Sequence, residues 1–238
     1  TDSDDATFTV NVAPVGVLET FDSYTPGNII GSYTGWYGSG TPVVTSGVGI
    51  SGSIGLAPGQ QIFTWTAHPF DWNAADFVGF NVQMDFETDA SAHLDDDRVG
   101  YMITDTSYES TNYLGVQLDP GGTGYNIETY WKNTGNGDAR VSIVSLPTLT
   151  ANTWYRLRLE IIKLTATSFS LTTSLTELDS NGNPVQVVAS GSIADTNTLG
   201  TEIPNTKYFT ATTSWPAFKN YNAIIGDADN AYIEIITT

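Results

Sequence analysis

The feature that most constrains this chain is a two-residue alternation of apolar and polar side chains that recurs along most of its length. In residues 77–87 (FVGFNVQMDFE), every second position from Val78 to Phe86 is apolar, and the positions between them are mostly polar. Residues 154–164 repeat the pattern. Because successive side chains of a strand point to opposite faces, each segment predicts a strand with one buried face. No segment sustains the 3.6-residue apolar period of an amphipathic helix.

The same kind of strand signal recurs between turns rich in glycine and asparagine. It is present at residues 42–50, 61–66, 98–104, 113–118, 125–131, 139–144, 168–178, 185–193, 208–212 and 231–237. The sequence DSNGN at residues 179–183 joins two of these segments and predicts a hairpin turn. A dozen or more strands, each with one apolar face, predict an all-β fold, namely a two-sheet antiparallel jelly-roll β-sandwich.

The chain is expected to contain one domain and a short leading segment. No linker divides residues 16–238, so we expect a single jelly roll there. Residues 1–15 are expected to be a linker or the remnant of a preceding module, with a short edge strand of the same domain as the alternative. Because the chain starts with neither Met nor a signal peptide, we expect a mature protein or a piece of a longer one.

Charge and cysteine content exclude several classes of function. The chain has 8 Lys and Arg against 26 Asp and Glu, a formal net charge of −18. We therefore expect no nucleic-acid and no membrane partner, because both kinds of surface require clustered cations. The absence of cysteine excludes a disulfide framework, a thiolate nucleophile and a zinc–thiolate site. No apolar run approaches the roughly 20 residues of a membrane span.

Three segments resemble a known family. They are LETFDSY at residues 18–24, NTWYRLRL at residues 152–159 and DNAYIEI at residues 229–235. Together they are similar to the opening, central and last strands of the concanavalin A-like (laminin-G-like) jelly rolls found in secreted bacterial glycan proteins. The resemblance implies an extracellular or cell-surface location. The family includes lectins, carbohydrate-binding modules, adhesin modules, glycoside hydrolases and polysaccharide lyases, and the fold does not select among them.

A catalytic role is the least favoured of these. Jelly-roll glycosidases place Glu-x-Asp-x-Glu on one strand, whereas this chain has Gln83, Asp85 and Glu87 at those positions. An amide cannot attack an anomeric carbon, so the match fails at the nucleophile. A lyase could use arginines together with Gln117 and Tyr130, but a net charge of −18 repels a polyanionic substrate.

Carboxylates near both ends of the domain form a candidate metal site. The resemblance implies that the first and last strands meet, which would bring Glu19 and Asp22 close to Asp227 and Asp229. Calcium prefers such oxygen ligands, and a cation would relieve the repulsion among four carboxylates. We therefore expect a structural Ca²⁺ there, with a solvated cluster of loop residues as the alternative.

The candidate ligand site is the polar face of the central strands, which would line one groove of a curved jelly roll. We expect planar polar groups and aromatic rings to bind sugar there, from Arg98, Gln117, Glu128, Tyr130, Trp131, Arg156 and Arg158, with Trp215 in a loop at the rim. The alternating neighbours Val99, Tyr101, Val116 and Leu157 should point inward. The alternative is a solvated face with internal salt bridges.

The leading hypothesis is a non-catalytic polysaccharide-binding module of a larger extracellular glycan-degrading protein. Two alternatives remain, namely an adhesin or structural spacer module and a catalytic jelly roll. The acidic composition favours a neutral polysaccharide over a polyanionic one. The other expected partners are further modules of the same polypeptide, and the module itself is expected to be a monomer.

Overall fold

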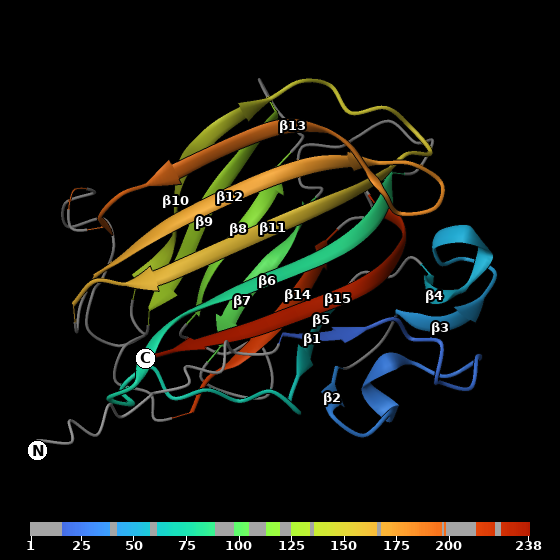
Figure 1. Ribbon diagram of the computed structural model, residues 1–238, viewed down its shortest axis with the longest axis horizontal. Coiled ribbons are helices and arrows are strands. Elements are labelled where there is room, and N and C mark those ends of the chain that lie inside the picture. Colours follow the sequence, from blue (N-terminus) through green and yellow to red (C-terminus); the bar gives the residue numbers. More distant parts are fainter. Residues whose placement is uncertain are drawn as a thin grey trace, which may run out of the picture.

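The computed structural model is a sandwich of two antiparallel β-sheets, as the alternation predicted (Figure 1). It describes residues 16–38, 42–57, 61–88, 98–104, 113–119, 125–133, 136–165, 168–196, 198, 213–221 and 225–238. The leading segment 1–15 and the predicted strand at 208–212 lie outside the described residues, so the expected domain boundary stays a prediction. No helix in these described ranges is long and apolar enough to cross a membrane.

The first sheet, here called sheet A, has the strand order β13-β12-β11-β6-β15-β4-β3, with β1 paired to β15. Its strands are β1 (Val17–Glu19), β3 (Val43–Ser46), β4 (Ile54–Ala57), β6 (Phe77–Thr88), β11 (Trp154–Lys163), β12 (Phe169–Leu178), β13 (Pro184–Ile193) and β15 (Ile225–Thr237). The first and last described strands are therefore neighbours, as the resemblance implied.

The second sheet, sheet B, has the order β10-β9-β8-β7-β14-β5-β2. Its strands are β2 (Trp36–Tyr37), β5 (Gln61–Trp65), β7 (Arg98–Thr104), β8 (Tyr113–Asp119), β9 (Tyr125–Asn133), β10 (Asn136–Leu146) and β14 (Trp215–Tyr221). Two single-turn 3-10 helices, η1 (Ile30–Ser32) and η2 (Ile50–Gly52), lie in the N-terminal lobe, which is blue in Figure 1.

The core lies between the sheets and follows the predicted alternation. In β6, Phe80, Val82, Met84 and Phe86 are all buried, and Leu157 and Leu159 of β11 pack beside them. Sheet B contributes buried side chains from the predicted inward positions of β7 and β8, among them Val99, Tyr101 and Val116. Burying one such large apolar side chain stabilises the fold by about 1.5–3 kcal/mol. The outward face of each sheet is thereby left to polar residues.

The hairpin between β12 and β13 forms where the sequence predicted it. Asp179 accepts hydrogen bonds through Oδ1 from the backbone N–H groups of Asn181, at 2.8 Å, and Asn183, at 2.9 Å. Gly182 has a φ of 79°, which favours glycine. A side chain that holds its own turn in this way fixes the register of the two strands that follow.

Candidate functional site

The predicted ligand residues lie on two different sheets. Arg156 and Arg158 belong to β11, which pairs with β6 and β12 in sheet A. The other predicted strand residues, from Arg98 to Tyr130, belong to β7, β8 and β9 of sheet B. The expectation of one shared groove is therefore wrong. Alternation fixes the face of a strand within its own sheet, but it carries no information on which sheet the strand joins.

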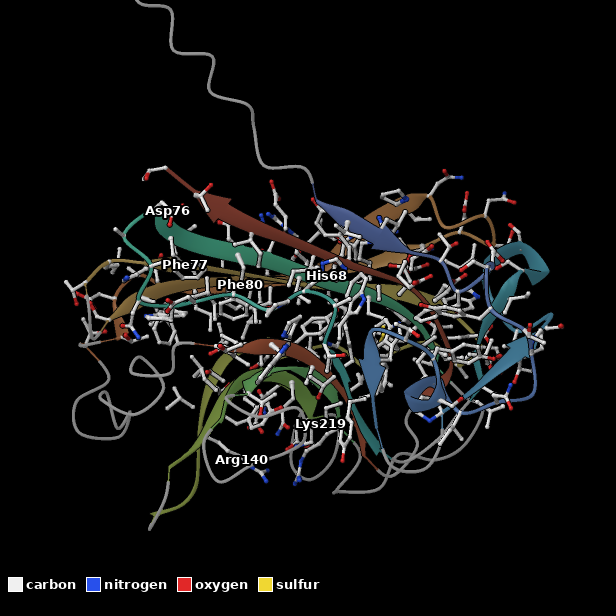
Figure 2. The ribbon with its side chains drawn as sticks, turned by 90° about the horizontal axis from the view of Figure 1, so that it is seen from below. His68, Asp76, Phe77, Phe80, Arg140 and Lys219 are labelled. Atoms are coloured by element: carbon white, nitrogen blue, oxygen red, sulfur yellow. The ribbon has the colours of Figure 1, made fainter. Side chains whose placement is uncertain are left out.

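The outer face of sheet B brings together residues that the sequence placed correctly and others that it missed. The strand register puts Gln117 beside Glu128 on one side and beside Gly100 on the other, and Gly100 lies beside Lys219 of β14. Arg140 of β10 lies beside Tyr130, the next outward residue of β9 after Glu128. In Figure 2, sheet B is arched, and Lys219 and Arg140 lie under the arch, on the side away from sheet A.

Lys219 was missed because the segment that carries it was predicted to be a loop. Trp215 and Pro216 suggested a turn, whereas Trp215 is the first residue of β14 and is half-buried. The alternation was present, because Phe218 is fully buried in the core and the next residue points outward. Trp131 lies in β9, but its side chain is outside what the structure describes.

A chain of polar contacts crosses five strands of this face. Lys219 Nζ donates to Gln117 Oε1 at 3.2 Å, and Gln117 Nε2 donates to Glu128 Oε1 at 2.5 Å. Arg140 Nη1 then lies 3.7 Å from Glu128 Oε1 and 3.4 Å from Asp119 Oδ2. We call the six residues of this row the sheet-B polar chain: Lys219, Gln117, Glu128, Arg140, Asp119 and Arg98, whose Nε is 3.5 Å from Asp119 Oδ2.

Exposure divides the polar chain into supporting and accessible members. The side chain of Gln117 is fully buried and Glu128 is 9% exposed, whereas the Arg140 side chain is 35% exposed. Burial raises the pKa of Glu128, and the hydrogen bond from Gln117 opposes that rise. A buried amide held at both ends leaves its neighbours little freedom to rotate, so the accessible groups are already oriented.

Tyr130 is not the exposed stacking platform that we expected. Its ring lies over Gly115 of the neighbouring strand, where an added Cβ would sit 2.6 Å from ring atoms. Its hydroxyl donates to the Tyr101 carbonyl oxygen at 3.3 Å, and Lys219 Nζ lies 4.5 Å from the ring centroid. The ring is 2% exposed. The sequence shows Gly115 in a predicted strand, but it does not show the register that sets this glycine beside Tyr130.

Three tryptophans next to irregular segments are buried. Trp36 stacks on Trp65 with ring centroids 4.9 Å apart, and Trp72 packs against Phe77 at 5.2 Å. All three indoles are less than 5% exposed. They fill the core next to the irregular segments, so they offer no stacking surface to a sugar.

The arginines of sheet A are occupied by carboxylates and amides of the same sheet. Arg156 forms a bidentate pair with Asp85 at 2.6 and 2.7 Å, and Asn230 Nδ2 donates to the same carboxylate at 3.0 Å. Asp85 is fully buried, which raises its pKa, while Arg156 opposes that rise. Arg158 Nη2 contacts Asn81 at 2.7 Å and Glu160 at 2.9 Å. These contacts match the alternative of internal salt bridges.

The four predicted metal ligands do not assemble into one cluster. Glu19 accepts hydrogen bonds from the backbone N–H of Phe21, at 2.8 Å, and the hydroxyl of Tyr24, at 2.7 Å. Asp227 interacts electrostatically with Glu87, and burial together with that charge raises its pKa to about 6. Among the residues with a described position, no three His, Asp or Glu side chains are placed to hold a metal ion.

Asp22 and Asp229 are the two members that the fold does bring together. Asp229 Oδ2 accepts from the Ile50 N–H at 2.9 Å and from Ser53 Oγ at 3.1 Å, and Asp22 Oδ1 accepts from the Ile54 N–H at 3.1 Å. Burial raises the pKa of Asp229 to about 6, and the charge of Asp22 adds to the rise. Both carboxylates thus hold the loop around η2, and calcium stays a prediction for this pair.

No family model matches the chain, and no curated protein matches its sequence. Solved structures do match. The CBM2 module of the evolved Dit protein of Lactobacillus casei BL23 phage J-1 has a TM-score of 0.51 at 11% identity, covering 95% of this chain and 99% of that one. Full-length tailspike protein 2 of an Escherichia coli O157:H7 bacteriophage has a TM-score of 0.50 at 16% identity.

That second match covers 93% of this chain but only 28% of the tailspike chain. The carbohydrate recognition domain of Emp46p is more distant, with a TM-score of 0.46 at 9% identity over 84% of this chain and 88% of that one. At these identities the likeness concerns the fold alone. The fold is a two-sheet antiparallel jelly-roll β-sandwich.

Proposed function

We propose that this chain is a non-catalytic glycan-binding module of an extracellular protein, and that the glycan lies on the outer face of sheet B. The observation that carries the proposal is the sheet-B polar chain, with its buried Gln117 held between Lys219 and Glu128. Planar amide, carboxylate and guanidinium groups in a fixed row suit the hydroxyls of a sugar chain. The matching fold of a CBM2 module supports the proposal.

The fold also supports a place within a longer polypeptide. The matched tailspike chain is more than three times as long as the region that this chain covers, because the coverage is 28%. A binding module raises the effective concentration of its partner modules at the glycan. Other modules of the same polypeptide, and an extracellular or cell-surface location, are therefore part of the proposal.

The test is a polysaccharide screen with the whole chain, by affinity electrophoresis, together with an assay for newly formed reducing ends. We expect retardation by at least one polysaccharide and no new reducing ends. Lys219→Met should weaken the retardation, while Arg158→Met, on the other sheet, should not. If the chain bound none of the polysaccharides, an adhesin or spacer role would be favoured instead.

A catalytic role has one specific observation in its favour. Asp119 and Glu128 both contact Arg140 Nη1, so their oxygens lie within about 7 Å, near the separations that glycosidases use. Glu128 also has a raised pKa, as a general acid requires. Release of reducing ends that disappears in Glu128→Gln would establish this alternative and overturn the non-catalytic proposal.

A structural Ca²⁺ at Asp22 and Asp229 is a further part of the proposal. Asp229 holds the η2 loop against β15 and Asp22 holds the start of β4 beside it, and the burial of Asp229 disfavours its ionised form unless a cation is near. A ligand that binds only the native state stabilises it by about 2.7 kcal/mol at a hundredfold excess over Kd. Chelator should therefore lower the melting temperature, and an unchanged melting curve would remove calcium from the proposal.

A further inference from the structure

The cations of this chain are not spread evenly over its acidic surface. On the outer face of sheet B, the described charged residues are the cations Arg98, Arg140 and Lys219 and the carboxylates Asp119 and Glu128. On the outer face of sheet A, Arg156 and Arg158 are the cations along β11, β6 and β15. They are surrounded by the carboxylates Asp85, Glu87, Glu160, Asp227, Asp229 and Glu234. Among the described side chains, the outer face of sheet B thus carries three cations against two carboxylates, within a chain of net charge −18.

Arg140 is placed to bind an anion through two of its oxygens. Its contacts with Asp119 and Glu128 both use Nη1, at 3.4 and 3.7 Å. In the part of the chain that the structure describes, Nε and Nη2 have no partner, and the side chain is 35% exposed under the arch of sheet B (Figure 2). The Nε–Nη2 edge of a guanidinium is a two-donor fork that matches the two oxygens of a carboxylate or sulfate.

Lys219 supplies a second cation on the same face. Its ammonium lies 3.2 Å from Gln117 Oε1 and 4.5 Å from the centroid of the Tyr130 ring. The amide oxygen and the ring face are both electron-rich and uncharged, so these two contacts hold the ammonium in place on this face. The buried Gln117 fixes this arrangement, because its Nε2 is committed to Glu128.

We infer that the glycan bound by sheet B is acidic, with its carboxylate or sulfate on the Nε–Nη2 edge of Arg140 and Lys219 as the second cation. This inference rests on the proposed function and names the class of its ligand. It reverses the expectation of a neutral polysaccharide, which came from the net charge of the whole chain. Salt screens distant charges beyond about 8 Å at physiological ionic strength, so a bound sugar senses the local face.

The test is titration calorimetry of the whole chain against four polymers at about 0.15 M salt, where distant charges are screened. The polymers are polygalacturonate, carboxyl-reduced polygalacturonate as its matched neutral form, dextran sulfate and dextran. We expect binding to at least one acidic polymer and none to its neutral counterpart. Binding of polygalacturonate alone would identify the anion as a carboxylate, and binding of dextran sulfate alone would identify it as a sulfate.

Three variants with the same charge change locate the site: Arg140→Gln, Lys219→Gln and, as the control on sheet A, Arg158→Gln. We expect Arg140→Gln to weaken acidic-polymer binding about tenfold or more, which corresponds to about 1.4 kcal/mol. Lys219→Gln should weaken it less, and Arg158→Gln should leave it unchanged. Circular dichroism checks the fold of each variant.

Three outcomes would overturn the inference. Equal losses in Arg140→Gln and Arg158→Gln would mean that net charge, not this face, governs binding. Equal affinity for polygalacturonate and its reduced form, or binding of dextran alone, would mean a neutral ligand and would leave the glycan-binding function intact. No binding to any of the four polymers, and none in the polysaccharide screen described above, would contradict the proposed glycan-binding function itself.

Discussion

The outer faces of sheets A and B use the same kinds of residue in opposite ways. On sheet A, Nε and Nη2 of Arg156 donate to the two carboxylate oxygens of Asp85. We call this a closed pair, because that edge of the guanidinium is already occupied. On sheet B, Arg140 reaches two carboxylates at longer distances through one nitrogen and keeps the other edge of its guanidinium open. A closed pair stabilises the sheet, whereas an open fork can exchange partners with a ligand. An arginine in a strand is therefore a binding candidate only when its neighbours leave donors available.

The largest expected effect on the free energy of unfolding comes from breaking the Arg156–Asp85 pair of sheet A. Arg156→Met leaves the fully buried Asp85 carboxylate without its cation, and an uncompensated buried charge of this kind costs about 3–5 kcal/mol in the free energy of unfolding. Arg158→Met is the matched control, because its pair with Glu160 is exposed and should cost about 0–1 kcal/mol. Urea denaturation measures both. Equal costs for the two variants would show that burial does not distinguish these pairs.

The next largest effect on stability is expected on sheet B, from disturbing the packing of Tyr130 on Gly115. In Gly115→Ala the new Cβ would lie 2.6 Å from the Tyr130 ring and 2.3 Å from the Tyr101 carbonyl oxygen. Overpacking of this kind costs about 1–3 kcal/mol in the free energy of unfolding and should displace the ring from beneath Lys219. Tyr130→Phe, which removes the 3.3 Å hydrogen bond to the Tyr101 carbonyl oxygen and leaves the ring in place, should cost less. The reverse order would mean that the hydroxyl, rather than the ring, anchors this face.

The pH dependence of stability tests the carboxylates at the end of sheet A. The pKa of Asp229 is raised to about 6 in the folded protein, so folding favours its protonated form. Its contribution to stability is fully present below the unfolded pKa of about 3.9 and is lost as the pH rises through about 6. In chelator, the free energy of unfolding should fall between about pH 4 and pH 6, the interval between the unfolded and the folded pKa of Asp229. The fall should be smaller in Asp229→Asn, and an identical slope in the two proteins would assign the effect to other groups.

The smallest expected effect concerns Glu128 and the open fork of sheet B. Burial raises the pKa of Glu128, which is surrounded by Gln117, Asp119, Arg140 and Arg98. Protonation of Glu128 removes one negative charge beside Arg140 and so reduces the repulsion of a bound acidic group. Affinity for an acidic polymer should therefore rise as the pH falls toward the raised pKa of Glu128. Glu128→Gln should bind with less dependence on pH, as calorimetry over the same pH series would show. An affinity that falls as the pH is lowered would contradict this repulsion.

Several features of this protein followed from the sequence alone. The alternation in residues 77–87 and 154–164 predicted two strands and their inward faces, because the side-chain period of a strand is fixed by its backbone. The hairpin at residues 179–183 followed from local turn chemistry. These are short-range properties, and they were sufficient to predict an antiparallel sandwich and its core.

Only the tertiary structure decided which strands share a sheet, and with that the site. Arg156 on β11 and Glu128 on β9 have the same alternation, yet the chain passes from β10 in sheet B to β11 in sheet A between them. Pairing of β14 with β7, which is distant in sequence, placed Lys219 beside Gly100, and the register of β9 on β8 laid Tyr130 over Gly115. The physical reason is that strand alternation depends on adjacent residues, whereas strand pairing depends on the packing of the whole chain.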